Sequence, residues 1–276
     1  MGSGGRALPH GASVSLLEVE ELSVRFGGLV AVNRVSFAVE EGTIVGLIGP
    51  NGAGKTTCFG LVTGFLAPTS GQVRFRGRPL TGLPPHAIAR EGVVRTFQKT
   101  SLFPRLTVQD NIMIGQQARL RPRVWAALAR THTQQLELRA VRERASEVLE
   151  LMAMSGVREV PARALSYGEQ RHLAIAIALA SRPALLLLDE PAAGLTPAES
   201  RRLMDLIRRI RGSGVTVLLV EHDMKVVMGV CDRLVVLDHG QKIAEGPPAA
   251  IRQDPEVIRV YLGVSPASEA ARAGRP

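Results

Sequence analysis

The stretch Gly49-Pro50-Asn51-Gly52-Ala53-Gly54-Lys55-Thr56 decides the fold, because it matches G-x-x-x-x-G-K-[ST] at every fixed position. An apolar run typical of a β-strand, residues 43–48, precedes it, and residues 57–62 have the pattern of a helix that packs on a sheet. Glycines let backbone N–H groups close around an anion, and the positive end of the following helix adds to the attraction. We therefore predict a phosphate-binding loop rather than a glycine-rich turn without a ligand.

Every residue of this loop is a candidate for nucleotide binding, and so is Thr57, which follows it. The ammonium group of Lys55 can reach the β- and γ-phosphates, and the hydroxyl of Thr56 can hold Mg²⁺. The expected ligand is therefore a nucleotide together with Mg²⁺.

The composition is that of an ordinary globular protein, since 45% of the 276 residues are hydrophobic and 21% are charged. The longest apolar runs fall well short of the roughly 18 residues that cross a bilayer, so no membrane span is expected. A net charge of +9 suits nucleic acid, nucleotide phosphates or anionic lipid, and charge alone does not choose among them. The aromatic residues are scattered, so no base-stacking platform is expected.

The two ends of the chain differ in composition from the rest. Residues 1–15 are rich in Gly and Ser without the apolar core of a secretory signal, so a flexible leader is expected there. Residues 265–276 are small and polar and are expected to be disordered, which leaves one domain over 16–264. Cys58 and Cys231 lack metal-ligand spacing, so both are predicted to be core thiols in a reducing compartment.

Short alternating strands are predicted on both sides of the loop. They cover residues 17–19, 22–26, 31–32 and 35–39, and a hairpin-like stretch follows at 71–78. These strands are expected to pair in an antiparallel manner and to flank the mononucleotide-binding unit. Residues 110–162 are rich in Ala, Leu, Glu and Arg and are predicted to form an all-helical insertion.

Two apolar runs later in the chain end in polar residues that can do chemistry. Residues 184–188 have the length of a buried parallel strand and end in Asp189 and Glu190, and residues 215–220 lead to His222. Ligands lie beyond the carboxyl ends of such strands, so Asp189 is expected to hold Mg²⁺ and Glu190 to orient or deprotonate the attacking water. His222 could hydrogen-bond a terminal phosphate, although a lone His at a strand end is more often only a polar loop residue.

Three further candidates lie at the ends of predicted elements. Ser166 is the natural N-cap of a helix that runs to Ala180, so Ser166 and Gly168 offer a second helix N-terminus to an anion. By itself that signal is weak, because Ser-capped helices are common. Gln98 is the polar end of a predicted strand. Phe26 is either exposed at a strand end or part of the core.

Taken together, these motifs resemble those of the ATP-binding subunits of ABC transporters in content, order and spacing. The residues that carry the resemblance are the loop at 49–56, Gln98, residues 165–170, residues 187–190 and His222. The resemblance extends from about residue 16 to residue 263. Within that family, residues 94–98, 189–195, 221–225 and 259–263 are similar to the ATPases of branched-chain amino acid importers, and lipopolysaccharide-export ATPases are similar too.

The resemblance implies a fold and a set of roles. The implied fold class is α/β, with a parallel-sheet core of the P-loop NTPase (RecA-like) kind, an N-terminal antiparallel β subdomain and an α-helical subdomain over about 110–162. Phe26 would stack on adenine, Gln98 would sense Mg²⁺ and water, and His222 would touch the γ-phosphate of ATP. Ser166 and Gly168 would bind the ATP of a partner chain, so that two chains enclose two ATP molecules.

Three positions, in two segments, depart from the pattern of the family: Tyr167, Glu169 and Thr196. The usual Leu-Ser-Gly-Gly-Gln is here Leu165-Ser166-Tyr167-Gly168-Glu169, which keeps the serine and one glycine. The usual Asp after Gly-Leu is Thr196, so a carboxylate that serves contacts between the two chains is missing.

The expected function is that of an ATPase subunit at the cytoplasmic face of the inner membrane, driving uptake of branched-chain or similar amino acids. The expected partners are membrane permease subunits, a second ATPase chain and, indirectly, a periplasmic or extracellular solute-binding protein. One alternative is a lipopolysaccharide-type export ATPase. A soluble ABC-type ATPase that acts on nucleic acid or ribosomes is another, but this chain has one loop and no long insert, so no nucleic-acid partner is expected.

Overall fold

The computed structural model describes residues 15–96, 102–116 and 132–262. Its centre is a six-stranded sheet in the order β10-β9-β3-β8-β7-β6. The strands of this sheet are β3 (Ile44–Ile48), β6 (Val93–Arg95), β7 (Leu185–Asp189), β8 (Thr216–Val220), β9 (Arg233–Asp238) and β10 (Gln241–Gly246). Neighbours are parallel except at the β10 edge, which is antiparallel to β9. The expected parallel-sheet core is therefore confirmed.

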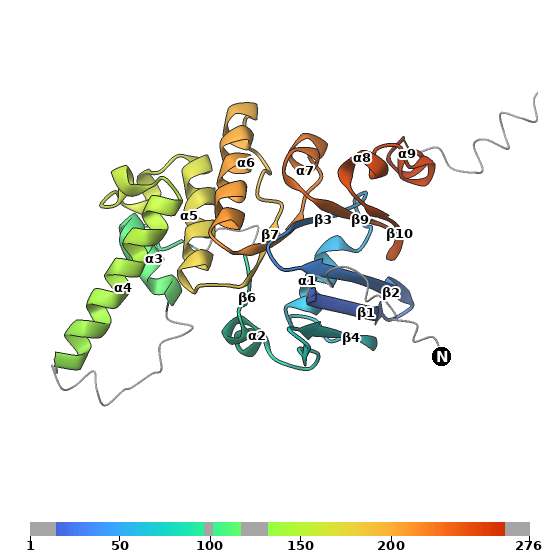
Figure 1. Cartoon of the computed structure of the whole chain (residues 1–276), viewed down its shortest axis with the longest axis horizontal. Coiled ribbons are helices and arrows are strands. Elements are labelled where there is room, and N and C mark those ends of the chain that lie inside the picture. Colours follow the sequence, from blue (N-terminus) through green and yellow to red (C-terminus); the bar gives the residue numbers. More distant parts are fainter. Residues whose placement is uncertain (1–14, 97–101, 117–131, 263–276) are drawn as a thin grey trace, which may run out of the picture.

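Both faces of this sheet are covered, which explains why its central strands are apolar throughout. Every residue of β3, β7 and β8 is buried. Figure 1 shows α6 and α7 over one face and α1 on the other. The helices of the sheet region are α1 (Lys55–Val62), α2 (Pro85–Glu91), α6 (Pro197–Gly212), α7 (Met224–Val230), α8 (Pro248–Ile251) and α9 (Pro255–Leu262). Cys58 and Cys231 are buried as expected, and burial raises the pKa of each thiol to about 12.

A second sheet of four antiparallel strands packs on α1, and its order is β2-β1-β4-β5. Its strands are β1 (Ser15–Phe26), β2 (Leu29–Glu40), β4 (Ser70–Phe75) and β5 (Arg78–Pro79). The prediction of separate short strands at 17–19 and 22–26, and at 31–32 and 35–39, was wrong, because β1 and β2 are each continuous. Glu21 and Arg34 have left-handed φ angles of 47° and 50°, so a bulge shifts the inward and outward alternation without ending the pairing.

The described residues between Thr107 and Ala180, which are 107–116 and 132–180, are mainly helical and lie at the far end of the large sheet (Figure 1). Its helices are α3 (Val108–Gly115), α4 (His132–Leu151), α5 (Tyr167–Ala180) and the short 3₁₀ turns η2 (Ser155–Val157) and η3 (Ala162–Ala164). The predicted domain limits, 16–264 with a helical part at about 110–162, stay a prediction, and the predicted leader and tail fall almost wholly outside the described residues. None of the helices described is long and apolar enough to cross a membrane.

Candidate nucleotide site

The predicted phosphate loop follows β3 directly, and neighbouring backbone leaves no room for a side chain at two of its glycines. A Cβ on Gly49 would lie 2.1 Å from the carbonyl oxygen of Leu237, and one on Gly54 would lie 2.6 Å from that of Ala31. The φ angles of Gly49 and Gly54 are +148° and +97°, which other residues rarely adopt. Both glycines of the motif are therefore required by packing as well as by backbone conformation.

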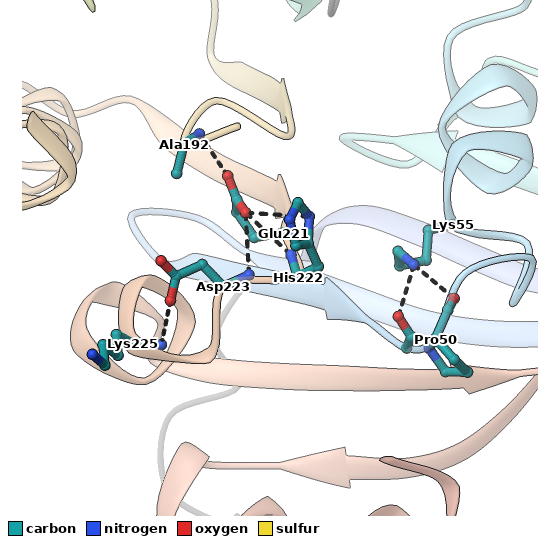
Figure 2. A network of polar contacts seen from close by, with 8 residues as sticks. Pro50, Lys55, Ala192, Glu221, His222, Asp223 and Lys225 are labelled. Carbon is teal, nitrogen blue, oxygen red and sulfur yellow. Dashed lines mark hydrogen bonds and ion pairs between the residues drawn. The ribbon is translucent and has the colours of Figure 1, made fainter. Parts of the chain in front are cut away.

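Lys55 is the first residue of α1 and turns its side chain back into the loop. Its Nζ donates to the carbonyl oxygens of Gly49 at 2.7 Å and Pro50 at 2.9 Å (Figure 2). Only 6% of the residue is exposed. Burial lowers the pKa of Lys55, while the charges of Glu190 and Asp189 act to raise it. The ammonium group is therefore enclosed by the loop, and it lies near enough to the two acids at the carboxyl end of β7 for their charges to act on its pKa.

The N-terminus of α1 differs from those of α3, α5 and α6. Each of those three helices begins with a capping box, in which the N-cap hydroxyl accepts from the backbone N–H of a Glu or Asp three residues later, and the carboxylate of that acid accepts from the N-cap N–H. The N-cap of α1 is Gly54, which has no side chain to act as a cap, and the first turn of α1 has no acidic residue. Among the described residues, no side chain caps this end of α1, so the first N–H groups of the helix, including those of Lys55, Thr56 and Thr57, are not covered by a carboxylate of its own first turn. This end of the helix is suited to an anion supplied from outside.

Asp189 and Glu190 lie at the carboxyl end of β7, one strand away from the loop across β8. Asp189 is buried, and its Oδ2 accepts a hydrogen bond from Arg95 at 2.6 Å. Its Oδ1 is buried and has no hydrogen-bond partner among the residues described. A buried carboxylate oxygen without a hydrogen-bond partner is suited to bind Mg²⁺, which is the role predicted for Asp189. The hydroxyl-bearing Thr56 is exposed at the start of α1, while Gln98 lies outside the described residues.

Glu221, which follows β8, connects the loop after Glu190 to the end of β8 through hydrogen bonds, and it was not among the predicted site residues. The residue is 0% exposed, and its carboxylate accepts from the backbone N–H groups of Ala192, His222 and Asp223 at 2.6, 3.1 and 3.4 Å (Figure 2). Burial raises the pKa of Glu221, and these three donors lower it. Glu221 therefore ties the loop after Glu190 to the end of β8. An acid directly after a buried strand was the available signal.

His222 is placed at the edge of this network with its side chain largely in solvent. The side chain is 58% exposed, and its Nδ1 lies 4.0 Å from the Glu221 carboxylate. It follows β8, the strand between β3 and β7, so it comes from the same sheet edge as the phosphate loop and the acids. The ring is free to contact a ligand at that edge.

Ser166 caps α5 as predicted, but its hydroxyl is already engaged. It donates to Glu169 Oε2 at 2.8 Å and accepts from the Glu169 backbone N–H at 3.3 Å. Gly168 is buried, and a Cβ there would lie 2.7 Å from Glu199 Oε1. Two carboxylates of the chain therefore lie at this helix N-terminus. An anion would bind there only if the Glu169 side chain turned away.

Tyr167, one of the residues that depart from the family pattern, links α5 to the loop after Glu190. Its hydroxyl donates to the carbonyl oxygen of Ala193 at 3.3 Å and accepts from Arg171 Nη2 at 2.6 Å. Any Cβ at Gly194 would lie 3.2 Å from the ring, so the glycine allows this contact. The departure thus gives the α5 N-terminus a direct contact with the loop that carries Glu190.

Phe26 ends β1 and is 49% exposed, which settles the two alternatives for its position in favour of the strand end. It pairs with Leu29 across the β1–β2 turn.

If Phe26 stacks on adenine, Phe26→Ala should weaken binding of ATP by about 10-fold and leave binding of inorganic triphosphate unchanged. Titration calorimetry with both ligands measures the difference. Leu29→Ala removes a more exposed apolar side chain beside the same turn and should affect neither ligand. Equal weakening of both ligands by Phe26→Ala would mean a packing defect.

The C-terminal helix α9 also reaches the phosphate loop. Burial raises the pKa of Tyr261, and a backbone hydrogen bond with Gly49 lowers it in part. Residues far apart in the sequence therefore meet at the first glycine of the loop.

Comparison with known proteins decides the family. The family model described as ABC transporter matches residues 32–193, and a second one, described as branched-chain amino acid ATP-binding cassette transporter, matches residues 241–267. The chain belongs to the ABC transporter family. The resemblance drawn from the sequence motifs is confirmed, and with it the expectation of an ABC-type ATPase.

Several characterised members of the family are similar over nearly their whole length. The branched-chain amino acid transport ATP-binding protein BraF of Pseudomonas aeruginosa is 47% identical, with 90% of this chain and 98% of BraF covered. LivG of Escherichia coli, with the same descriptive name, is 45% identical, with 91% and 99% covered. The lipopolysaccharide export ATP-binding protein LptB of Escherichia coli is 37% identical, with 91% and 98% covered.

Solved ATP-binding cassettes of ABC transporters have the same fold. One in its ADP conformation superposes with a TM-score of 0.79 at 29% identity and covers 90% of this chain and 99% of its own. A nucleotide-free cassette gives a TM-score of 0.77 at 29% identity, with 90% and 98% covered. The expected fold class is therefore confirmed.

Proposed function

We propose that this ABC-family chain is the ATP-hydrolysing subunit of an importer for branched-chain or similar amino acids. The observation that best supports ATP hydrolysis is the position of Lys55. Its ammonium group is enclosed by the phosphate loop, and the charges of Glu190 and Asp189 act to raise its pKa. The solute class is supported by the match of residues 241–267 and by the similarity to BraF and LivG.

In this proposal the uncapped N-terminus of α1 and the loop residues bind the phosphates of ATP, and Lys55 exchanges its contacts with loop carbonyls for phosphate oxygens. Thr56, Asp189 and Gln98 are the residues that would hold Mg²⁺, and the bound ion would neutralise charge that develops on the phosphates. Glu190 orients the attacking water and takes its proton, because it lies just outside the strand while Asp189 is buried within it. His222 hydrogen-bonds the γ-phosphate.

The second half of each site comes from a partner chain, which is a second ATPase cassette, identical or related. Ser166 and Gly168 face the nucleotide held by that partner. Since Glu169 caps the same helix end, its carboxylate must leave the Ser166 hydroxyl before a phosphate can take its place. Tyr167 transmits the resulting shift to the loop after Glu190 through its contact with Ala193.

The chain works at the cytoplasmic face of the inner membrane, bound to permease subunits that carry the solute received from a solute-binding protein. Affinity purification from native membranes, followed by identification of co-purifying subunits, tests this. We expect the co-purifying proteins to be two permease subunits and a second ATPase cassette of an amino-acid importer. Lipopolysaccharide-export components would favour the export alternative. Ribosomal or nucleic-acid material retained at low salt and lost at high salt would favour the soluble alternative.

The shared site predicts complementation between two inactive variants. Lys55→Ala chains lack the phosphate loop contact and Ser166→Arg chains lack the partner contact, so each alone should be inactive. In a mixed head-to-tail dimer, one of the two sites receives an intact loop from one chain and an intact Ser166 from the other. ATPase activity should therefore return in the mixture.

Dimer formation and subunit exchange must first be shown, by light scattering of a Glu190→Gln form with ATP and by exchange of labelled chains. If Ser166 served the nucleotide of its own chain, every site in the mixture would carry one lesion. A mixture no more active than its separate components would then contradict the shared site.

A further inference from the structure

A buried ion pair joins the last residues of two neighbouring strands, Arg95 of β6 and Asp189 of β7. Arg95 Nη2 lies 2.6 Å from Asp189 Oδ2, and the two side chains are only 10% and 2% exposed. The guanidinium also lies over the ring of Phe59 of α1, with 5.6 Å between its central carbon and the ring centroid. Arg95 is thus enclosed between the sheet and the helix that begins at the phosphate loop.

The strand ends that carry this pair are held in register by the backbone. The Thr96 N–H donates to the carbonyl oxygen of Leu187 at 2.9 Å, and the Asp189 N–H donates to the Thr96 hydroxyl at 3.4 Å. The pair therefore has little freedom to rearrange. One oxygen of Asp189, Oδ2, is engaged by Arg95, while the other, Oδ1, is buried and has no hydrogen-bond partner among the described residues.

We propose that Arg95 is the resident counter-ion of Asp189 and that it limits the affinity of the site for Mg²⁺. The inference deepens the proposed function, because that function places Mg²⁺ at Asp189. A buried carboxylate without a cation strongly destabilises a fold, so Arg95 supports Asp189 whenever no metal is bound. It fixes the carboxylate so that Oδ1 is the oxygen left for the metal.

Arg95 and a Mg²⁺ ion at Asp189 would both be bound to one carboxylate. Because both are positively charged and lie close together, they would repel each other. The repulsion between the guanidinium and a divalent ion a few ångströms away raises the free energy of metal binding. This cost is larger than the conformational entropy saved because Arg95 already holds the short Asp189 side chain in place. Arg95 is therefore a positioning residue that makes metal binding weaker, not stronger. In an enzyme that must release its product in each cycle, this makes Mg²⁺ retention depend on the phosphates of the nucleotide.

Replacing Arg95 should have two opposite effects that a purely structural residue would not combine. In EDTA, Arg95→Met should lower the midpoint of thermal unfolding by about 6–12 °C, as expected when one partner of a buried pair is removed from a chain of this size. Addition of about 10 mM Mg²⁺ without nucleotide should raise the midpoint of Arg95→Met by about 3 °C or more, and leave the wild type nearly unchanged. Binding of Mn²⁺, followed by electron paramagnetic resonance, should be about 10-fold tighter in Arg95→Met.

Three variants serve as controls. Arg76→Met breaks an ion pair with Glu41 in which both side chains are more than half exposed, so neither readout should change. Asp189→Asn combined with Arg95→Met should recover stability in EDTA and abolish the response to Mg²⁺. Arg95→Lys keeps the charge and should behave as the wild type toward Mn²⁺.

If Arg95→Met lost stability without gaining affinity for Mn²⁺, Arg95 would be a packing residue and the proposal would be wrong. Should Arg95→Met not fold, Arg95→Gln is measured instead, and an unchanged Mn²⁺ affinity would overturn the proposal equally. These measurements use the cation alone. A chain that bound Mn²⁺ as described but never hydrolysed ATP would therefore refute the proposed function and leave this inference standing.

Discussion

Glu190→Gln is expected to slow ATP hydrolysis by about 10²- to 10⁴-fold while ATP still binds. Glu190 follows β7 with a left-handed φ of 47°, and its backbone N–H donates to Val220 O at 2.9 Å, so the strand end stays in place. Gln has the same size and keeps hydrogen bonding, but it cannot take a proton from water. Single-turnover hydrolysis with excess enzyme, beside equilibrium binding of ATP, separates the two effects.

Glu150→Gln is the matched control for this substitution, because Glu150 is an exposed residue of α4 remote from the loop. It should hydrolyse ATP at the wild-type rate. Near-normal turnover by Glu190→Gln would move the catalytic base to another residue, with the buried carboxylate of Glu221 as the first to consider.

Lys55→Ala is expected to weaken ATP binding by at least about 10²-fold, because charge-assisted hydrogen bonds to two phosphates are lost together. The fold should remain intact. Burial lowers the pKa of Lys55, so at neutral pH its charge is less favourable in the folded protein than in the unfolded chain. The midpoint of thermal unfolding without nucleotide should therefore be unchanged or slightly raised.

Lys225→Ala provides the comparison, since Lys225 is exposed on α7, its backbone N–H donates to Asp223 Oδ1 (Figure 2), and its side chain has no hydrogen bond or ion pair with any described residue. It should bind ATP normally. A drop in unfolding temperature for Lys55→Ala would show that its two bonds to loop carbonyls stabilise the fold, and the loss of ATP binding could then follow from a disordered loop.

The parts of the site that are local in sequence could be predicted. The phosphate loop and the acids after β7 are each encoded by a few consecutive residues, and the strands that carry them are continuous apolar runs. The capping of α5 by Ser166 was predictable for the same reason. The sequence did not show that the Ser166 hydroxyl is already hydrogen-bonded to Glu169 and so is not free for an anion, because no role was predicted for the Glu169 side chain.

What could not be predicted depends on pairs that are distant in sequence. Arg95 and Asp189 are 94 positions apart and meet only because β6 and β7 are neighbours in the sheet. Glu221 looked like one polar residue among three after β8, and only the folded structure brings the Ala192 N–H to it. The irregularities at Glu21 in β1 and Arg34 in β2 interrupt the alternation without a Gly or Pro to mark them, so each of these two strands was divided into two.

The central claim is that hydrolysis by this chain drives uptake of amino acids through separate membrane subunits. Transport of radiolabelled leucine into vesicles that contain the co-purified permease subunits, with MgATP supplied on the side of this chain, tests it most directly. The account predicts uptake that requires MgATP and is lost when Glu190→Gln replaces the wild-type chain, with Glu150→Gln as active as the wild type. Leucine uptake that is indifferent to MgATP or to the Glu190 substitution would contradict it.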